Sequence, residues 1–488
     1  MDKLLGFTPD MDPTVPGVIT SCTNFIPYEQ GMKGAPTGST PSGTPALAAA
    51  CVGASVVTKL DDTRRIIAGT ATKLYELSSG SWVDQSRVSG GAYAGGTDTR
   101  WSFAQFGNST LAANLTDKIQ RSNTSGAFSD IATAPQAKII FPVGGFVMAL
   151  NTVDGTYGTT PNRWWCCALY DETTWTPSVT TLATTGQLVS SPGQITAGLK
   201  LGEYAVAYKD KAIHVGQFVG APSVFDWVQI PGGDAGCVGQ DALCDIGGAH
   251  FFVGQDNIWL FDGSRPTPLG VGQLRQWFYS NSNPSFRYKT QCVFDRQNNV
   301  VWVFYPSSSS TVCDQAIVYH VQTKQWGCVT TTVEAVLNYI AAGVTIDGLS
   351  AISSTIDGLS AYSFDSQYWL AGGRALSVFN SSHQLQLVTG VSSSSSFDTG
   401  DAGDDETTSL LSKIRIRFAP GYSPGTGSVS TFTKMTEGDS LNLRNTGTIN
   451  DGKFDVLQDG RFHRASFSFT GDVRVIGVGA VLTPMGNA

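Results

Sequence analysis

The sequence predicts an all-β protein: a β-propeller with an extended N-terminal arm and a small C-terminal β-sandwich-like domain. The clearest sign is the stretch 247–263, where two runs rich in aromatic and branched residues, 251–253 and 258–261, flank the turn Gly-Gln-Asp-Asn. Two such runs around a tight turn are typical of an antiparallel hairpin. Neither run alternates between apolar and polar residues, so both faces of the hairpin are expected to be covered by neighbouring sheets.

Similar units recur along the chain, which is the second sign. Copies lie at 66–83, 110–121, 292–305 and 315–326. Small antiparallel sheets repeated in this way are the building units of a propeller. The copies differ too much to give a fixed period, so the sequence does not give the number of blades.

Composition is the third sign. Of the 488 residues 41% are apolar, enough for a large core, while only 14% are charged and 55 are glycines. Ordinary domains carry about 25% charged residues, so this chain is expected to have a turn-rich, polar but uncharged surface that also suits contact with copies of itself. The net charge of −8 argues against a general DNA-binding surface, which needs clustered Lys and Arg.

Bulk features also exclude some classes of protein. The opening MDKLLGFTPD has no long apolar segment, and no apolar run approaches the ~18 residues that cross a bilayer, so neither a secretory signal nor a membrane span is expected. The nine cysteines are odd in number and scattered. This pattern favours free thiols in a reducing cytoplasm over a disulfide framework.

The first 47 residues are expected to form the arm and a linker. Prolines at 13, 16, 27 and 36 exclude a regular helix between residues 10 and 36. Apolar residues there, Phe25, Ile26 and Tyr28 among them, are too frequent for a disordered tail. We expect an extended arm that lies on the body or on a neighbouring subunit, with these three residues as candidate contacts between subunits.

The propeller is expected to occupy residues 48–391, and a C-terminal β-domain residues 392–488. The amphipathic segment Leu269–Ser280 is the best candidate for a helix. A serine run at 392–396, followed by acidic residues up to Glu406, is the sharpest change in composition and predicts a solvated boundary. Beyond it Lys413–Phe418 alternates at period two, typical of a strand with one wet face. The last strands form either a small sandwich or the closure of the propeller ring.

No residue pattern in the sequence indicates an enzyme, a metal site or a cofactor. Cys237, Cys244 and His250 lack the spacing of a structural zinc site and are expected to be core residues. The acidic run at 398–406 lacks the ligand pattern of a calcium loop. A Gly-x-Ser-x-Gly elbow, the repeated Asp-containing turn of sialidase propellers and phosphate-cradling glycine loops are all missing from the sequence.

Short segments in a fixed order nevertheless resemble a known family. They are Asp10–Gly17, Cys22–Pro27, Gly31–Pro36, Arg100–Asn108, Pro161–Trp164 with Trp175, Gly202–Tyr204, Tyr319 with Trp326, and Arg461–Arg464. Together they resemble the propeller-containing tail hub or nozzle proteins of short-tailed double-stranded-DNA bacteriophages, nearly from end to end. The resemblance implies a virion part assembled in the host cytoplasm: a ring, expected to be a homo-hexamer, below the portal. Its implied partners are the head-to-tail adaptor, a tail fibre or tailspike, a tail-tip or plug protein, and genomic DNA that passes through without specific binding.

A repeated heptapeptide supplies candidate channel residues for such a ring. TIDGLSA occurs at 345–351 and again at 355–361, which places Asp347 and Asp357 on two similar turns. Carboxylates on a channel wall would repel DNA phosphates and let the genome slide. The competing interpretation, that each Asp braces its own turn through backbone hydrogen bonds, has somewhat greater weight.

A second hypothesis is a carbohydrate-binding or glycan-cleaving propeller at a cell surface. Tryptophans such as Trp164, Trp165 or Trp369 would then be exposed and stack on sugars. A ring-forming protein and a monomeric lectin are told apart by light scattering and by a glycan array.

Overall fold

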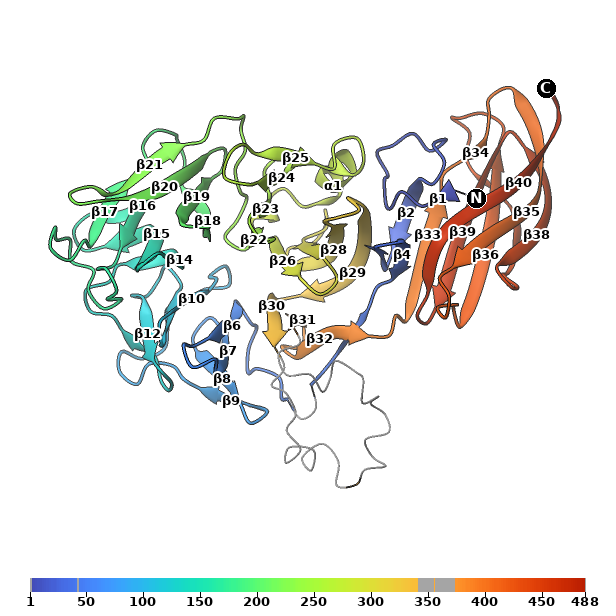
Figure 1. Cartoon of the computed structure of the whole chain (residues 1–488). Coiled ribbons are helices and arrows are strands. Elements are labelled where there is room, and N and C mark those ends of the chain that lie inside the picture. Colours follow the sequence, from blue (N-terminus) through green and yellow to red (C-terminus); the bar gives the residue numbers. More distant parts are fainter. Residues whose placement is uncertain (1, 42–43, 341–354, 356–373, 488) are drawn as a thin grey trace.

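The computed structural model describes residues 2–41, 44–340, 355 and 374–487. Most of the described chain is β-strand, in antiparallel sheets (Figure 1), so the predicted all-β class is confirmed. Asp347, Asp357 and Trp369 lie outside the described residues.

The propeller has seven blades within the described residues. Six four-stranded sheets form six of them, and the first four strands of a ten-stranded sheet form the other. The first three blades are β6 (Ala54–Thr58), β7 (Arg64–Gly69), β8 (Leu74–Ser78) and β9 (Ser81–Asp84); β10 (Ser102–Phe106), β11 (Ser109–Ala113), β12 (Gln120–Asn123) and β13 (Ser129–Asp130); and β14 (Gln136–Val143), β15 (Phe146–Asp154), β16 (Gly158–Cys166) and β17 (Thr184–Gln187). The next three are β18 (Ile195–Leu201), β19 (Tyr204–Lys209), β20 (Ile213–Gly220) and β21 (Val224–Gln229); β22 (Leu243–Asp245), β23 (His250–Val253), β24 (Ile258–Phe261) and β25 (Thr267–Leu269); and β26 (Gln291–Asp295), β27 (Val300–Tyr305), β28 (Cys313–His320) and β29 (Trp326–Val333).

The seventh blade closes the ring with a strand from the N-terminus. It consists of β30 (Ala335–Ile340), β31 (Arg374–Phe379), β32 (Leu385–Gly390) and β5 (Thr37–Ser39). Strand β5 pairs with β32 through Ser39 opposite Leu387 and Gly38 opposite Val388. The inner strand β30 contacts β6 of the first blade, so the circle of inner strands is complete. The N-terminal arm therefore provides the closure, and the C-terminal strands do not.

The hairpin at 251–261 lies where the sequence predicts it, as β23 and β24. Phe251 pairs with Leu260 and Phe252 with Trp259. Both strands are almost wholly buried, which explains why neither alternates between apolar and polar residues.

One helix, α1 (Arg275–Asn281), and a short 3₁₀ turn at Arg287–Lys289 precede the sixth blade. The helix overlaps the predicted segment 269–280 and ends one residue beyond it. It starts later than predicted, because Gly270 and Gly272 have φ angles of +70° and +71°, which no α-helix contains. Its first turn is capped by the distant arm residue Asp10, whose carboxylate accepts the N–H groups of Gln276 (2.6 Å) and Trp277 (2.9 Å). This bond fixes the arm to the propeller.

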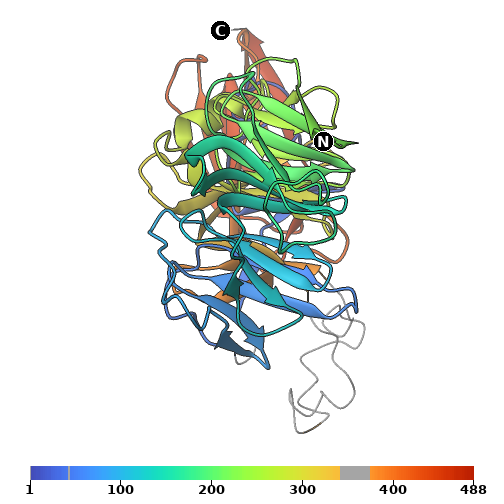
Figure 2. The same ribbon diagram turned by 90° about the vertical axis from the view of Figure 1, so that its left-hand side faces the viewer.

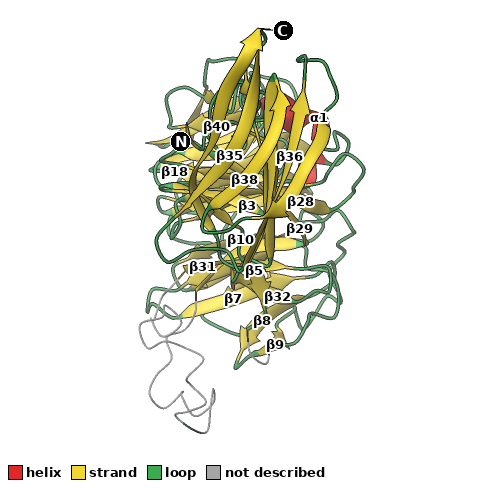
Figure 3. Ribbon diagram, turned by 90° about the vertical axis from the view of Figure 1, so that its right-hand side faces the viewer, coloured by secondary structure: helices red, strands yellow, loops and turns green. Residues whose placement is uncertain are grey.

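The C-terminal domain is a sandwich of two sheets. One contains β33 (Ser394–Thr399), β34 (Ala402–Gly403), β36 (Thr426–Lys434), β37 (Asn442–Thr448) and β39 (Phe462–Thr470); the other contains β35 (Thr407–Phe418), β38 (Lys453–Gly460) and β40 (Arg474–Asn487). The long strands β35, β36, β38 and β40 are seen together in Figure 3, and in Figure 2 this domain lies behind the propeller. Ile414 and Ile416 are buried while Arg415 and Arg417 are exposed, the alternation that the sequence predicts for this strand.

The serine run and Asp401 are not solvated as the composition predicts, whereas Asp404, Asp405 and Glu406 are exposed. Ser394–Thr399 is strand β33, in which Ser395 and Phe397 are buried. Asp401 is also buried, at an N–O distance of 2.8 Å from Lys434 and 2.7 Å from Arg464. Serine side chains are small enough to fit between packed strands, and a carboxylate can be buried when cations pair with it. The polar composition of 394–401 therefore does not mean that these residues are exposed.

The strands of the N-terminal arm pair with sheets of both domains of its own chain. Besides β5 it contributes β1 (Asp2–Lys3), β2 (Ile19–Thr23), β3 (Phe25–Tyr28) and β4 (Gly31–Gly34). Strand β2 pairs with β33, β3 pairs with β29, and β4 pairs with β40. The sheet of the sixth blade thus continues through the arm into the C-terminal sheet.

The nine cysteines are all free and buried, as the sequence predicts. Among the described residues no helix is long and apolar enough to cross a membrane.

Candidate functional site on the propeller axis

The inner strands of the seven blades enclose a hollow of about 610 Å³ on the propeller axis. Every inner strand, from β6 to β30, contributes to its wall. The wall is mixed: apolar side chains such as Phe103, Ile140 and Leu243 alternate with polar groups such as Asp245 and Asn338. A propeller axis of this kind is an ordinary place for a ligand or partner to bind.

A charged network spans the axis at the start of the inner strands. The guanidinium Nε of Arg100 lies 2.8 Å from Asp241 Oδ2, and Nη1 donates to the carbonyl of Glu334 (2.9 Å). Gln291 Nε2 donates to the same carbonyl (3.0 Å). Arg100 precedes the second blade, whereas Asp241, Gln291 and Glu334 lie at the start of the fifth, sixth and seventh blades. Through Arg100 the network therefore connects the second blade to the fifth and seventh, which are not its neighbours in the ring.

The side chain of Glu334 extends this network to the connection between the arm and the first blade. One carboxylate oxygen accepts the N–H of Cys51 (2.9 Å), and the other contacts His383 Nδ1 (2.7 Å). The carboxylate thereby holds the chain just before β6 against the seventh blade, where the ring closes.

A second hollow, of about 260 Å³, contains a lysine and an aspartate that are not in direct contact. Burial lowers the pKa of Lys138 and raises the pKa of Asp210. The opposite charge of the other residue acts against burial in both cases without cancelling it. No ion pair within the described part of the chain joins them. With Thr196, Gln194 and Arg287 on its wall, the hollow suits water or a small polar molecule.

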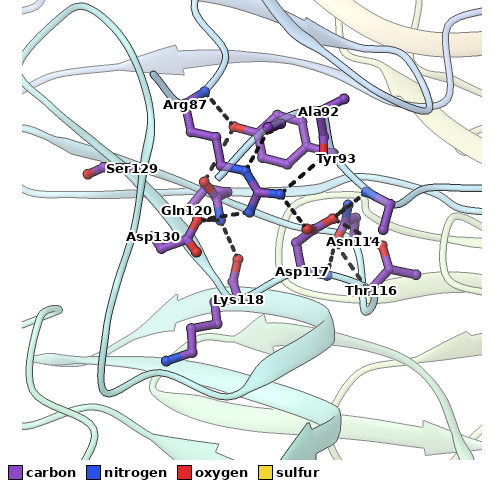
Figure 4. A network of polar contacts seen from close by, with 12 residues as sticks. Arg87, Ala92, Tyr93, Asn114, Thr116, Asp117, Lys118, Gln120, Ser129 and Asp130 are labelled. Atoms are coloured by element: carbon purple, nitrogen blue, oxygen red, sulfur yellow. Dashed lines mark hydrogen bonds and ion pairs between the residues drawn. The ribbon is translucent and has the colours of Figure 1, made fainter. Parts of the chain in front are cut away.

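An extensive polar network lies between the first two blades and has Arg87 at its centre (Figure 4). Arg87 bonds to Asp117 (2.9 Å) and Asp130 (3.0 Å) and lies 4.7 Å from the ring centre of Tyr93. The second oxygen of Asp117 accepts the N–H of Ala94 (2.9 Å). Because its charges and hydrogen-bonding groups are satisfied internally, this network stabilises the fold and offers no free group for chemistry.

We expect the substitution Arg87→Ala to lower the free energy of unfolding by about 3 kcal/mol, because it leaves the buried Asp117 carboxylate without its cation. Urea unfolding followed by circular dichroism measures this loss. Lys73→Ala, which breaks the exposed pair with Asp84 (side chains 49% and 42% exposed), is the control and should shift the midpoint only slightly. Equal effects of the two variants would contradict the assignment.

Of the three arm residues expected at a subunit interface, Phe25 and Ile26 lie inside their own chain instead, and Tyr28 is half-buried. Phe25 and Ile26 are 0% and 2% exposed. Phe25 stacks on Phe397 at 5.2 Å between ring centres, and the hydroxyl of Tyr28 is buried. The side chain of Phe25 joins the propeller to the C-terminal domain, and that of Ile26 packs among propeller residues, so neither has surface left for another copy. Asp347 and Asp357 remain a prediction, since they lie outside the described residues.

The residues weighed as metal ligands are placed in the core. Cys237 and His250 are fully buried and Cys244 is 8% exposed. Both ring nitrogens of His250 are engaged, one by the Tyr208 hydroxyl (2.7 Å) and one by the Lys200 carbonyl (3.0 Å). Within the described ranges no three His, Cys, Asp or Glu side chains gather as a metal site.

Two of the tryptophans considered for sugar stacking are unavailable. Trp164 and Trp165 are 5% and 6% exposed in the core of the third blade. Adjacent aromatic residues on a strand at a blade centre are both buried when sheets cover both faces, and the sequence alone does not reveal that cover at this position.

Comparison with known proteins does not assign this chain to a family. No family model matches the chain, and no curated protein matches it. Solved structures do match, and one of them is described as "YCF48 bound to D1 peptide"; it is 12% identical, covers 64% of this chain and 93% of its own, and superimposes with a TM-score of 0.37. A likeness at this level carries no argument about function.

Proposed function

We propose that this chain is a structural subunit of the tail nozzle of a short-tailed bacteriophage, a ring of six copies that forms the exit channel for DNA. The proposal starts from the ordered resemblance of segments between Asp10 and Arg464. The expected partners are an adaptor ring above, fibres or tailspikes at the side, and a tip or plug protein below.

The observation that carries the proposal is the arm. Residues 2–39 supply strands to the seventh blade, to the junction beside the sixth blade and to both sheets of the sandwich. Backbone hydrogen bonds and a shared core then join two domains that could otherwise hinge. A subunit that transmits load between tail components needs such stiffness.

The size of the axial hollow decides where DNA would pass. One turn of B-DNA is about 34–36 Å long and its major groove alone is about 12 Å wide, so a duplex does not fit a hollow of about 610 Å³ crossed by the Arg100–Asp241 pair. A DNA channel therefore has to run between copies of the chain. Asp347 and Asp357 are the candidates for its acidic lining.

Sedimentation with tail-less particles tests the proposal. Heads that carry portal and adaptor but lack this chain should bind the purified chain, and negative-stain images should then show an added sixfold ring below the adaptor. In free solution the assembled species should have six times the chain mass of 51.7 kDa. A chain that stays monomeric and fails to cosediment with such heads would refute the proposal, because the template ring is present in that experiment.

A further inference from the structure

We propose that the face of the second and third blades carries a binding site for a neutral saccharide, centred on Tyr170. The site is a hollow of about 510 Å³ lined by residues that include Phe106, Asn108, Asn123, Tyr170 and Glu172. It borders the axial hollow, with which it shares Gln105 and Pro142, but it does not involve the arm, and the proposal does not depend on the nozzle assignment.

Tyr170 is an aromatic platform in an unusual backbone conformation. It is the third residue of the tight turn Ala168–Asp171, closed by a bond from the Asp171 N–H to the Ala168 carbonyl (3.2 Å), and its φ is +59°. That position normally takes Gly or Asn, because a side chain there is strained. The side chain is nonetheless a large ring, 78% exposed, so packing does not explain why it is present. A strained residue held open to solvent points to binding.

The ring is held in place from below by a glycine. A Cβ atom on Gly145 would lie 2.9 Å from the Tyr170 ring and 2.7 Å from Leu169, so a larger residue there would push both side chains aside. The Tyr170 N–H also donates to the Gly145 carbonyl (2.8 Å). The backbone of the turn is therefore held on the blade, and the ring stays largely exposed, as stacking on a sugar requires.

Hydrogen-bonding groups of both kinds surround the platform. Ser109 (2.6 Å) and Arg121 (2.7 Å) both bond to Oε1 of Glu172, and no hydrogen bond of the described residues engages Oε2. The side-chain oxygen of Asn108 accepts the Leu60 N–H and that of Asn123 contacts the Thr124 hydroxyl, which leaves two amide N–H₂ groups as donors at the rim. A carboxylate acceptor, two amide donors and an aromatic face match the hydroxyls and the C–H face of a sugar ring.

The charge of the site selects a neutral ligand. Burial alone would raise the pKa of Glu172, but the bonds from Ser109 and Arg121 outweigh it and lower the pKa, so the carboxylate is ionised at neutral pH. Its partner Arg121 already occupies one oxygen. An anionic sugar would meet the free carboxylate oxygen and be repelled, whereas a hexose or an N-acetylhexosamine donates a hydroxyl to it.

Saturation-transfer NMR on the purified full chain with maltotriose, cellotriose and N,N′,N″-triacetylchitotriose, followed by an array of neutral and sialylated glycans, tests this inference. At least one neutral glycan should bind, and Tyr170→Ala should weaken it at least tenfold. Tyr170→Gly, which removes the ring and relieves the strained φ, should do the same without a cost in folding. Tyr157→Ala, on another exposed tyrosine (47%), should change the affinity less than twofold.

Three results would overturn the inference: no binding of any neutral glycan, binding of sialylated glycans alone, or binding that survives both Tyr170 variants. Assembly with tail-less particles should be unaffected by Tyr170→Ala. The saccharide site and the nozzle proposal can therefore fail independently.

Discussion

Replacing Phe25 with alanine should lower the free energy of unfolding by about 3–5 kcal/mol, the usual cost of removing a large buried ring. Phe25 is fully buried and stacks on both Phe397 (5.2 Å) and Phe469 (6.3 Å) of the C-terminal domain, while its backbone lies beside Cys328 of the sixth blade. A loss of this size is a large fraction of the stability of a typical domain, about 5–15 kcal/mol. Urea unfolding followed by tryptophan fluorescence and by circular dichroism measures it.

The matched control is Leu457→Ala, on a strand of the same domain but 76% exposed, which should be close to neutral. Deletion of residues 1–39, which removes β1–β5, should abolish cooperative unfolding of both domains. The sequence alone predicts a propeller that folds without residues 1–36. Because β3 pairs with β29 of the sixth blade and β5 completes the seventh, we expect the opposite for a chain that lacks residues 1–39. A propeller that unfolds at its normal midpoint without the arm would contradict the structure.

Mild acid should destabilise the protein strongly, with most of the loss between pH 6.5 and about 4. Burial lowers the pKa of four histidines, His214, His250, His320 and His463, and brings that of His214 to about 4. A histidine with a depressed folded-state pKa is protonated first in the unfolded chain. Its contribution is therefore fully present above the unfolded value of about 6.5 and is lost as pH falls toward the folded value. For His214 alone the loss is about 3 kcal/mol at 1.36 kcal/mol per pKa unit.

Urea midpoints at pH 7.5, 6.0 and 5.0 check this dependence. They should fall steadily, and His214→Gln should make the fall less steep, because one proton-binding site is removed from the unfolded chain. A midpoint that stays constant from pH 7.5 to 5.0 would show that these side chains are not buried as neutral groups.

Local features of the fold could be predicted from the sequence because their partners are neighbours in the chain. The hairpin β23–β24 joins runs only four residues apart, and its composition specifies both strands and turn. Strand β5, by contrast, is only Thr-Gly-Ser. It joins β32 through backbone bonds across some 350 positions, so its own side chains give no hydrophobic pattern that would reveal it.

The axial network was missed for the same reason. Arg100 and Asp241 are 141 positions apart. Each lies just before an inner strand, β10 or β22, and nothing in the sequence around either residue indicates its partner. Only the closed ring brings them to one axis. The arm is an intermediate case: its apolar residues predict that it is buried, but the sequence does not say whether the surface that buries it belongs to the same chain.

Cryo-electron microscopy of intact short-tailed virions that carry a gold-labelled C-terminal tag on this chain tests the central claim most directly. The nozzle assignment predicts six labels arranged in one ring below the adaptor, with density into which the propeller and sandwich of each copy fit as one unit, and DNA on the sixfold axis between copies. Labels on the capsid or the fibres, or particles without label that still have complete tails, would contradict it.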